Sequence, residues 1–174
     1  MANVSIFFLV FILFVSNSLS AQSSDYVYID YAHEITRNFI KEAKKDLGLL
    51  CYATGGSMPY DVVEIEVSFE CFKLVTIEEA RDLEVTATEM LRKKINEHEK
   101  IRPYLRNYPI KSGDARIKIA FLTKDGTESN DLALILHARN KLFYEAKDPV
   151  SNKFFTIFEE PYEEALKIVL KKTL

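Results

Sequence analysis

The first 21 of the 174 residues lack any charged side chain, and they also lack an apolar run long enough to cross a membrane. Their apolar run extends from Ile6 to Val15. That length fits the roughly 7–15 residues of a signal-peptide core and falls short of the ~20 residues of a membrane span. We therefore expect a secretory signal peptide at 1–21 and an exported single domain at 22–174, periplasmic or secreted.

Two further absences bear on export. Residues 1–5 contain no Lys or Arg, which leaves an uncleaved amino-terminal anchor as the alternative. No cysteine lies near the predicted cleavage site, so the sequence does not indicate lipid attachment. Once the signal peptide is removed, we expect no stable membrane anchor.

The predicted signal peptide contributes no charged side chain to the net charge of the chain. All 23 basic and 26 acidic residues follow residue 21, so the exported domain carries the whole net charge of −3. A mildly acidic domain lacks the basic surface that attracts nucleic acid or anionic membranes. We expect a protein partner rather than nucleic acid, and the sequence does not fix the oligomeric state.

Residues that hold metals or act as nucleophiles are few. The three histidines are spread over two predicted helices and a strand, with no pair at ligand spacing: His33, His98 and His137. His137 shares the polar phase of its strand, which predicts a surface or edge position. No serine stands in a nucleophile-elbow pattern. We therefore expect no metal and no cofactor, and the sequence shows no catalytic constellation.

Carboxylates recur on one predicted strand, at alternate positions: Glu64, Glu66 and Glu70. Paired carboxylates can act as a general acid and base, but alternating glutamates are also typical of the solvent face of a strand. We expect the solvent face.

The exported domain has two cysteines, Cys51 and Cys71. An even pair in an oxidising compartment favours a disulfide. Alternation along the strand that ends at Cys71 places this thiol on the buried side with Phe69, and Cys51 lies near the end of a predicted helix. We predict a Cys51–Cys71 bridge that closes a loop of about 20 residues and adds about 3 kcal/mol of stability. Two free buried thiols are the alternative.

Apolar spacing predicts three helices. The first covers Tyr28–Leu50, and the second follows the capping box Thr76–Glu79 and ends near Ile101, before Pro103. The third begins at Pro161, because proline suits the first helical position.

Alternating apolar residues and turn signals predict four or five strands, namely 61–74, 116–122, 132–138, 142–146 and a last edge strand at 154–158. The predicted order is therefore α-β-α-β-β-β-(β)-α. This order indicates an α+β fold with a largely antiparallel sheet packed by the helices.

The segment Arg102–Pro109 combines arginine and tyrosine on a proline-bounded loop. These two residue types are favoured at the energetic centres of protein interfaces. We take four of its residues as partner-binding candidates: Arg102, Tyr104, Arg106 and Tyr108. In the alternative interpretation, the tyrosines cover the sheet edge and the arginines pair with nearby acids.

A second candidate is the segment 54–59, whose two glycines and one proline predict a loop. Apolar and aromatic residues flank this flexible backbone, which would suit a ligand-binding loop: Tyr52, Gly55, Gly56, Met58 and Tyr60. The alternative is a simple turn that reverses the chain into the next strand.

The stretches 76–81 (TIEEAR) and 101–109 (IRPYLRNYP), with Gly55–Met58 and Tyr162–Leu166, resemble an uncharacterised family of exported bacterial proteins. The likeness covers nearly the whole exported domain. It implies a bacterial origin and a single domain, and it carries no catalytic residue because that family has no assigned activity.

Three classes of function follow from these patterns. The first is a non-enzymatic interaction module that acts on a protein partner or at the cell envelope. The second is a lipid or small-molecule carrier with a cavity between sheet and helices, an idea that rests on the 12 Phe and 9 Tyr. The third is a hydrolase whose site is assembled only in the folded chain.

Overall fold

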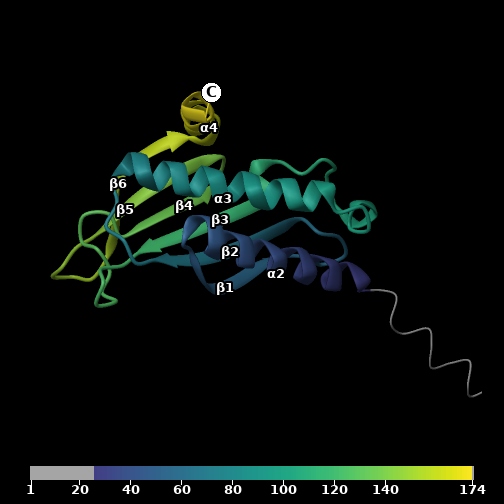
Figure 1. The fold of residues 1–174 in the computed structure, drawn as a ribbon, viewed down its shortest axis with the longest axis horizontal. Helices are drawn as coiled ribbons and strands as arrows, with labels where there is room; N and C mark the ends of the chain where they lie inside the picture. Colours follow the sequence, from purple (N-terminus) through teal and green to yellow (C-terminus); the bar gives the residue numbers. More distant parts are fainter. Residues whose placement is uncertain (1–25, 174) are drawn as a thin grey trace, which may run out of the picture.

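The structure is a computed structural model that describes residues 26–173. The predicted signal peptide, 1–21, lies outside the described residues. Three helices cover one face of a single six-stranded sheet (Figure 1). The elements follow in this order: α2 (Val27–Leu47), β1 (Leu50–Ser57), β2 (Glu64–Cys71), α3 (Ile77–Glu97), β3 (Ala115–Phe121), β4 (Leu134–Ala138), β5 (Lys141–Lys147), β6 (Phe154–Pro161) and α4 (Tyr162–Thr173).

The α+β class and the three helices are confirmed, whereas the strand number and the element order need correction. The sheet has six strands in the order β1-β2-β3-β4-β5-β6, and β2 pairs with β3 in parallel. This parallel pair follows from α3, because a helix that crosses over between two neighbouring strands returns the chain in its original direction. The remaining neighbours are antiparallel.

The strand missing from the predicted order is β1, because its glycines suggested a loop. The first helix ends at Leu47, where Gly48 takes a left-handed conformation with φ 69°. The chain then pairs with β2 along Leu50–Ser57. At Gly56, φ is 150° and an added Cβ would lie 2.3 Å from the carbonyl oxygen of Glu64. Glycine is therefore required here by the close approach of two strands rather than by a turn.

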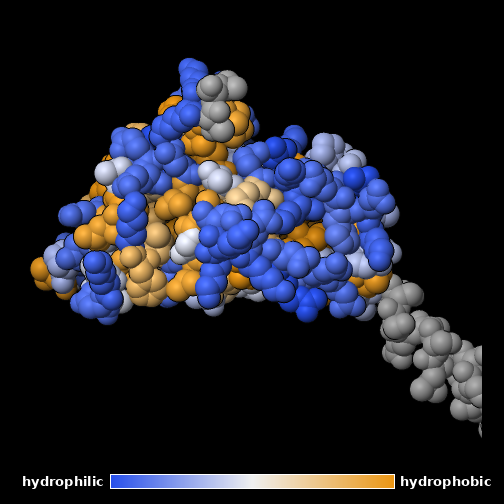
Figure 2. All heavy atoms as spheres, in the orientation of Figure 1, coloured by the Kyte–Doolittle hydropathy of each residue, from blue (hydrophilic) through white to orange (hydrophobic). Residues whose placement is uncertain are grey.

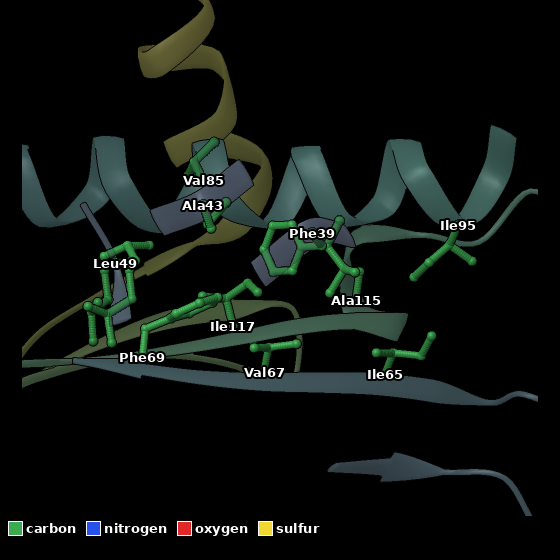
Figure 3. Close-up of a cluster of buried hydrophobic side chains, with 14 of the residues drawn as sticks. Phe39, Ala43, Leu49, Ile65, Val67, Phe69, Val85, Ile95, Ala115 and Ile117 are labelled. Atoms are coloured by element: carbon green, nitrogen blue, oxygen red, sulfur yellow. The ribbon is translucent and has the colours of Figure 1, made fainter. Parts of the chain in front are cut away.

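The core lies between the sheet and α2 and α3 (Figure 3). Phe39 of α2 meets Phe69 of β2 edge to face, with ring centroids 5.7 Å apart. Val85 and Ile95 of α3 point toward the same layer (Figure 3). Aromatic and branched side chains therefore fill the space under these helices.

The glutamates of β2 lie on the opposite face of the sheet from this core. Arg116 of β3 pairs there with Glu64 at 3.1 Å and with Glu66 at 3.6 Å. These side chains are half-buried. They therefore form a paired charge cluster on the sheet face that the helices leave open.

The capping box of α3 is confirmed in both directions. The Thr76 side chain accepts from the backbone N–H of Glu79 at 3.2 Å, and the Glu79 carboxylate accepts from the backbone N–H of Thr76 at 3.0 Å. We expect Thr76→Ala to lower the free energy of unfolding by about 1 kcal/mol. Thr76→Ser keeps the acceptor and serves as the matched control in urea denaturation. Equal losses for both variants would contradict a capping role.

Candidate functional site

The predicted partner-binding loop is held at both ends. The Val62 N–H donates to the Tyr104 carbonyl at 2.7 Å, and the Arg106 N–H donates to the Val62 carbonyl at 3.0 Å. Farther along, the Asn96 side chain accepts from the Ile110 N–H at 2.8 Å. The loop is therefore fixed before any partner binds, which lowers the entropy lost on binding.

Two of the four loop candidates, Tyr104 and Arg106, contact other parts of the fold. Tyr104 is half-buried, with its ring centroid 5.6 Å from that of Tyr28. Arg106 donates to both carboxylate oxygens of Asp61, at 3.0 and 2.8 Å. These two side chains follow the alternative interpretation, in which tyrosine covers the fold and arginine pairs with an acid.

The other two candidates, the half-buried Arg102 and the exposed Tyr108, contact each other. The Arg102 guanidinium lies over the Tyr108 ring, 5.3 Å from the centroid. Its Nε also donates to the Asn96 carbonyl at 3.1 Å. Tyr108 itself is 53% exposed. Arg102 therefore supports Tyr108 from the protein side and leaves the ring to face outward.

A cleft of about 990 Å³ opens beside Tyr108, and we call it the end cleft. One wall is the segment 106–112, and the facing wall is Glu89 and Arg92 of α3 with the first turn of α4. The hairpin residue Asn140 closes one end and accepts from the Tyr162 N–H at 3.0 Å. Both charge signs line the end cleft, which suits a partner segment that also carries polar groups of both kinds.

An apolar groove of about 540 Å³ runs on from the end cleft between α3 and α4. The two depressions share Glu89, Arg92 and Leu166. Met90 and Leu170 line the far part of the groove. Hydrophobic surface gathers around the base of α4, at the top of Figure 2. A polar cleft and an apolar groove therefore adjoin each other.

The α3 wall of the end cleft is connected to the interior through Tyr162. Arg92 pairs with Glu89, which accepts from the Tyr162 hydroxyl at 3.1 Å. The Tyr162 ring stacks on His137, with the centroids 4.4 Å apart and the planes 4° apart. The imidazole Nδ1 lies 3.8 Å from Glu84 Oε1. Polar groups therefore run from the surface of the end cleft to a buried acid and a buried histidine.

His137 lies in the core, so the predicted surface or edge position is wrong. His137 is 1% exposed, and Glu84 is 0% exposed. The β4 strand is central and buries Leu134 on one face and Ile135 on the other. Because both faces of β4 are buried and apolar, the alternation of its residues does not indicate which face meets the helices.

The buried pair is electrically neutral near pH 7. Burial raises the pKa of the Glu84 carboxyl to about 8. Burial, together with the charge of Arg116, lowers the pKa of His137 to about 4. Within residues 26–173, Glu84 Oε2 and both imidazole nitrogens have no hydrogen-bond partner, while Glu84 Oε1 accepts from Thr88 at 2.9 Å. Both side chains lie below the surface. In this conformation they therefore affect the stability of the fold and do not contact a ligand.

A second buried network lies nearby and is ionic. Arg81 Nε donates to Glu160 Oε1 at 2.7 Å, and the Tyr144 hydroxyl donates to the same oxygen. Burial, together with the hydrogen bond to Glu160, raises the pKa of Tyr144. This triad joins α3 to β5 and β6, so it fixes the helix against the far side of the sheet.

Sequence reasoning missed Glu84, Arg81 and Glu160 because charged residues on helices and strand ends are usually solvated. One signal was available. Glu84 and Thr88 stand four residues apart on the stripe of α3 that also contains Ala80 and Leu91. Polar residues on an apolar stripe indicate a buried polar group.

The ligand-loop candidates do not converge. Tyr52, Gly55 and Gly56 belong to β1, so the predicted loop is wrong over most of its length. Met58 packs on the core, and its carbonyl accepts from the Tyr28 hydroxyl at 3.4 Å. Tyr60 is exposed. The ligand-binding role of this segment stays a prediction.

The two cysteines lie on neighbouring strands as free thiols. Cys51 is opposite Phe69, and Cys71 follows two residues later on β2. Such diagonal neighbours have Cα atoms about 7–8 Å apart, slightly beyond the usual disulfide range. Burial raises the pKa of both thiols, which disfavours the reactive thiolate. The bridge stays a prediction that a small backbone shift would permit.

Between residues 26 and 173, no cluster of three or more His, Cys, Asp or Glu could hold a metal ion. In the same range, no hydrogen bond joins a serine or cysteine side chain to a histidine. No helix in this range has the length and apolar content to cross a bilayer.

The fold and the site define an α+β protein with a mixed sheet covered by helices on one face and a cleft at one end. Comparisons of the chain with family models, curated proteins and solved structures found no match. The family resemblance stays a prediction.

Proposed function

We propose that the protein is an exported, non-enzymatic module that binds a segment of a protein partner in the end cleft. The observation that carries this proposal is the fixed loop that holds Tyr108 at the mouth of a cleft of about 990 Å³. An exposed aromatic ring on a preorganised backbone provides contact area at low entropic cost. The adjoining apolar groove gives the same partner a place to bury hydrophobic side chains.

The partner segment follows from the lining. The end cleft carries Arg106 and Lys111 on one wall and Glu163 on the other. A flexible peptide segment with charges of both signs and an apolar end matches this arrangement better than a polyanion, which would meet the acidic wall.

Photo-crosslinking tests the proposal in cells that make the protein. A photoreactive phenylalanine analogue at Tyr108 is expected to give one product of defined mass, linked to a single segment of one protein. The same analogue at Phe72 is the matched control. Phe72 is also exposed, but it follows the end of β2 that is farther from Val62 and the loop, so it is expected to give no crosslinked product.

The purified partner segment then tests the energetics. We expect Tyr108→Ala to weaken its binding by about thirtyfold, the effect of losing a central aromatic contact. The thermal midpoint is expected to stay unchanged, because Tyr108 is largely outside the core. Equal crosslinking from both positions, or unchanged affinity of Tyr108→Ala, would contradict the proposal.

A small-molecule carrier is the second candidate, because the groove between α3 and α4 is mainly apolar. Native mass measurement separates the two functions. A carrier is expected to retain a small ligand that denaturation removes, whereas an interaction module is expected to show the mass of the chain or of its protein complex.

A further inference from the structure

Strand β6 leaves one edge of the sheet open and apolar. It is the last strand in the sheet order and pairs only with β5. Four of the five side chains between Phe154 and Phe158 are large and apolar, and they are 39–50% exposed. Edge strands of this kind usually carry a charge or a proline in their middle, and this stretch has neither. Unprotected apolar edges are surfaces for strand pairing.

The stretch is self-complementary. Read from either end, it presents two large apolar residues, then Thr156, then two more. Phe155 lies opposite Ala146 and Phe158 opposite Tyr144, both buried on the helix side of β5. Phe155 and Phe158 therefore share one face, although Ile157 has no opposite residue on β5. An antiparallel copy can place its Phe158 beside Phe155 and its Phe155 beside Phe158, so that the two-fold axis passes between Thr156 and Ile157 and each Thr156 lies beside the Ile157 of the other copy.

Charge supports the same pairing. Lys153 precedes the apolar stretch, and Glu159 follows it. In the antiparallel register given above, Lys153 of each copy lies opposite Glu160 and one position from Glu159 of the other copy, whereas a parallel pair would bring like charges together. A two-fold axis relates antiparallel strands and makes both ends equivalent.

We propose that β6 pairs with β6 of a second copy of this chain, forming a two-fold symmetric dimer. Its sheet is continuous, with six strands from each copy and the helices on one face. None of the residues that line the end cleft belongs to β6. The inference is therefore independent of the proposed function, and each can fail alone.

Sedimentation equilibrium of the purified protein, its N-terminus defined by intact mass, tests the dimer. The wild type is expected to have twice the chain mass. Phe155→Lys brings like charges into the pair and is expected to give a monomer. Tyr52→Lys, at an exposed position on the other edge strand β1, is the matched control and is expected to stay dimeric.

A charge exchange keeps the test decisive if Phe155→Lys fails to fold. Lys153→Glu and Glu159→Lys each place like charges at both ends of the homodimer, although the second change also removes the pair between Glu159 and Lys141 at 2.6 Å. Each variant alone is expected to raise the dimer dissociation constant about tenfold. An equimolar mixture is expected to form heterodimers of near wild-type affinity, because every end then pairs opposite charges.

Several outcomes overturn the proposal. They are a monomeric wild type, particles without a defined mass, equal dissociation of Phe155→Lys and Tyr52→Lys, and failure of the mixed variants to associate. A strand from another protein bound at β6 in place of a second copy would overturn it as well.

Discussion

Arg81→Ala is expected to lower the free energy of unfolding by about 3–5 kcal/mol, among the largest effects of any single substitution in this protein. Both members of the Arg81–Glu160 pair are almost fully buried, with side-chain exposures of 9% and 8%. Without the guanidinium, the Glu160 carboxylate keeps one donor among residues 26–173, the Tyr144 hydroxyl. A buried carboxylate that has lost its counterion costs more than the pair itself contributes.

Two matched variants separate this effect from ordinary loss of charge. Lys141→Ala breaks the exposed ion pair with Glu159, the neighbour of Glu160 on β6. This change is expected to lower the free energy of unfolding by about 1 kcal/mol or less. The triple variant Arg81→Met, Glu160→Leu, Tyr144→Phe removes all three polar groups together and is expected to be more stable than Arg81→Ala. Urea denaturation measures all of them. A loss below about 1 kcal/mol for Arg81→Ala would show that water reaches the carboxylate.

Raising the pH from 6.5 to 8 is expected to destabilise the fold by about 2 kcal/mol through Glu84. The pKa of this carboxyl is about 8 in the folded chain, against an ordinary 4.5. Between these values the unfolded chain has released a proton that the folded chain retains, so stability falls as the pH rises. His137 works in the opposite sense, because its pKa falls from 6.5 to about 4 and stability is lost on acidification. Between about pH 4.5 and 6.5, the effects of Glu84 and His137 on the pH dependence of the unfolding free energy cancel.

Glu84→Gln tests this account, because the amide has the same shape and does not titrate. We expect its unfolding free energy to be flat from pH 6.5 to 8 relative to the declining wild type, so that the difference between the two changes by about 2 kcal/mol. Comparison of the two proteins cancels the other titrating groups. Parallel curves over this range would mean that Glu84 is already ionised in the folded chain.

Much of the fold could be predicted from the sequence, because its helices and later strands have strong local signals. The capping box at Thr76 lies where it was expected, and the strand after Gly113 keeps its alternation. β1 could not be predicted, because Gly55 and Gly56 have the composition of a loop. The proximity of the Glu64 carbonyl explains Gly56, whereas a Cβ added at Gly55 would meet no atom within 4 Å.

The candidate site could be predicted only in part, for a different reason. The loop 102–109 shows its arginines and tyrosines locally, whereas Glu89 and Tyr162 reach the end cleft from two helices 73 residues apart in the chain. No local pattern connects such residues. The burial of Arg81 and Glu160 could not be predicted either. A charged side chain is expected to be exposed unless its partner in the fold is known.

The strand order of the sheet has a consequence for how the chain folds. Each strand lies beside the strand that precedes it in the sequence, from β1 to β6. Every pairing except the one across α3 therefore closes a short loop, and short loops form quickly. We therefore expect the slow step of folding to be the crossover that brings β3 beside β2 in parallel. After this step, we expect β4, β5 and β6 to be added in succession, so that the open apolar edge forms last.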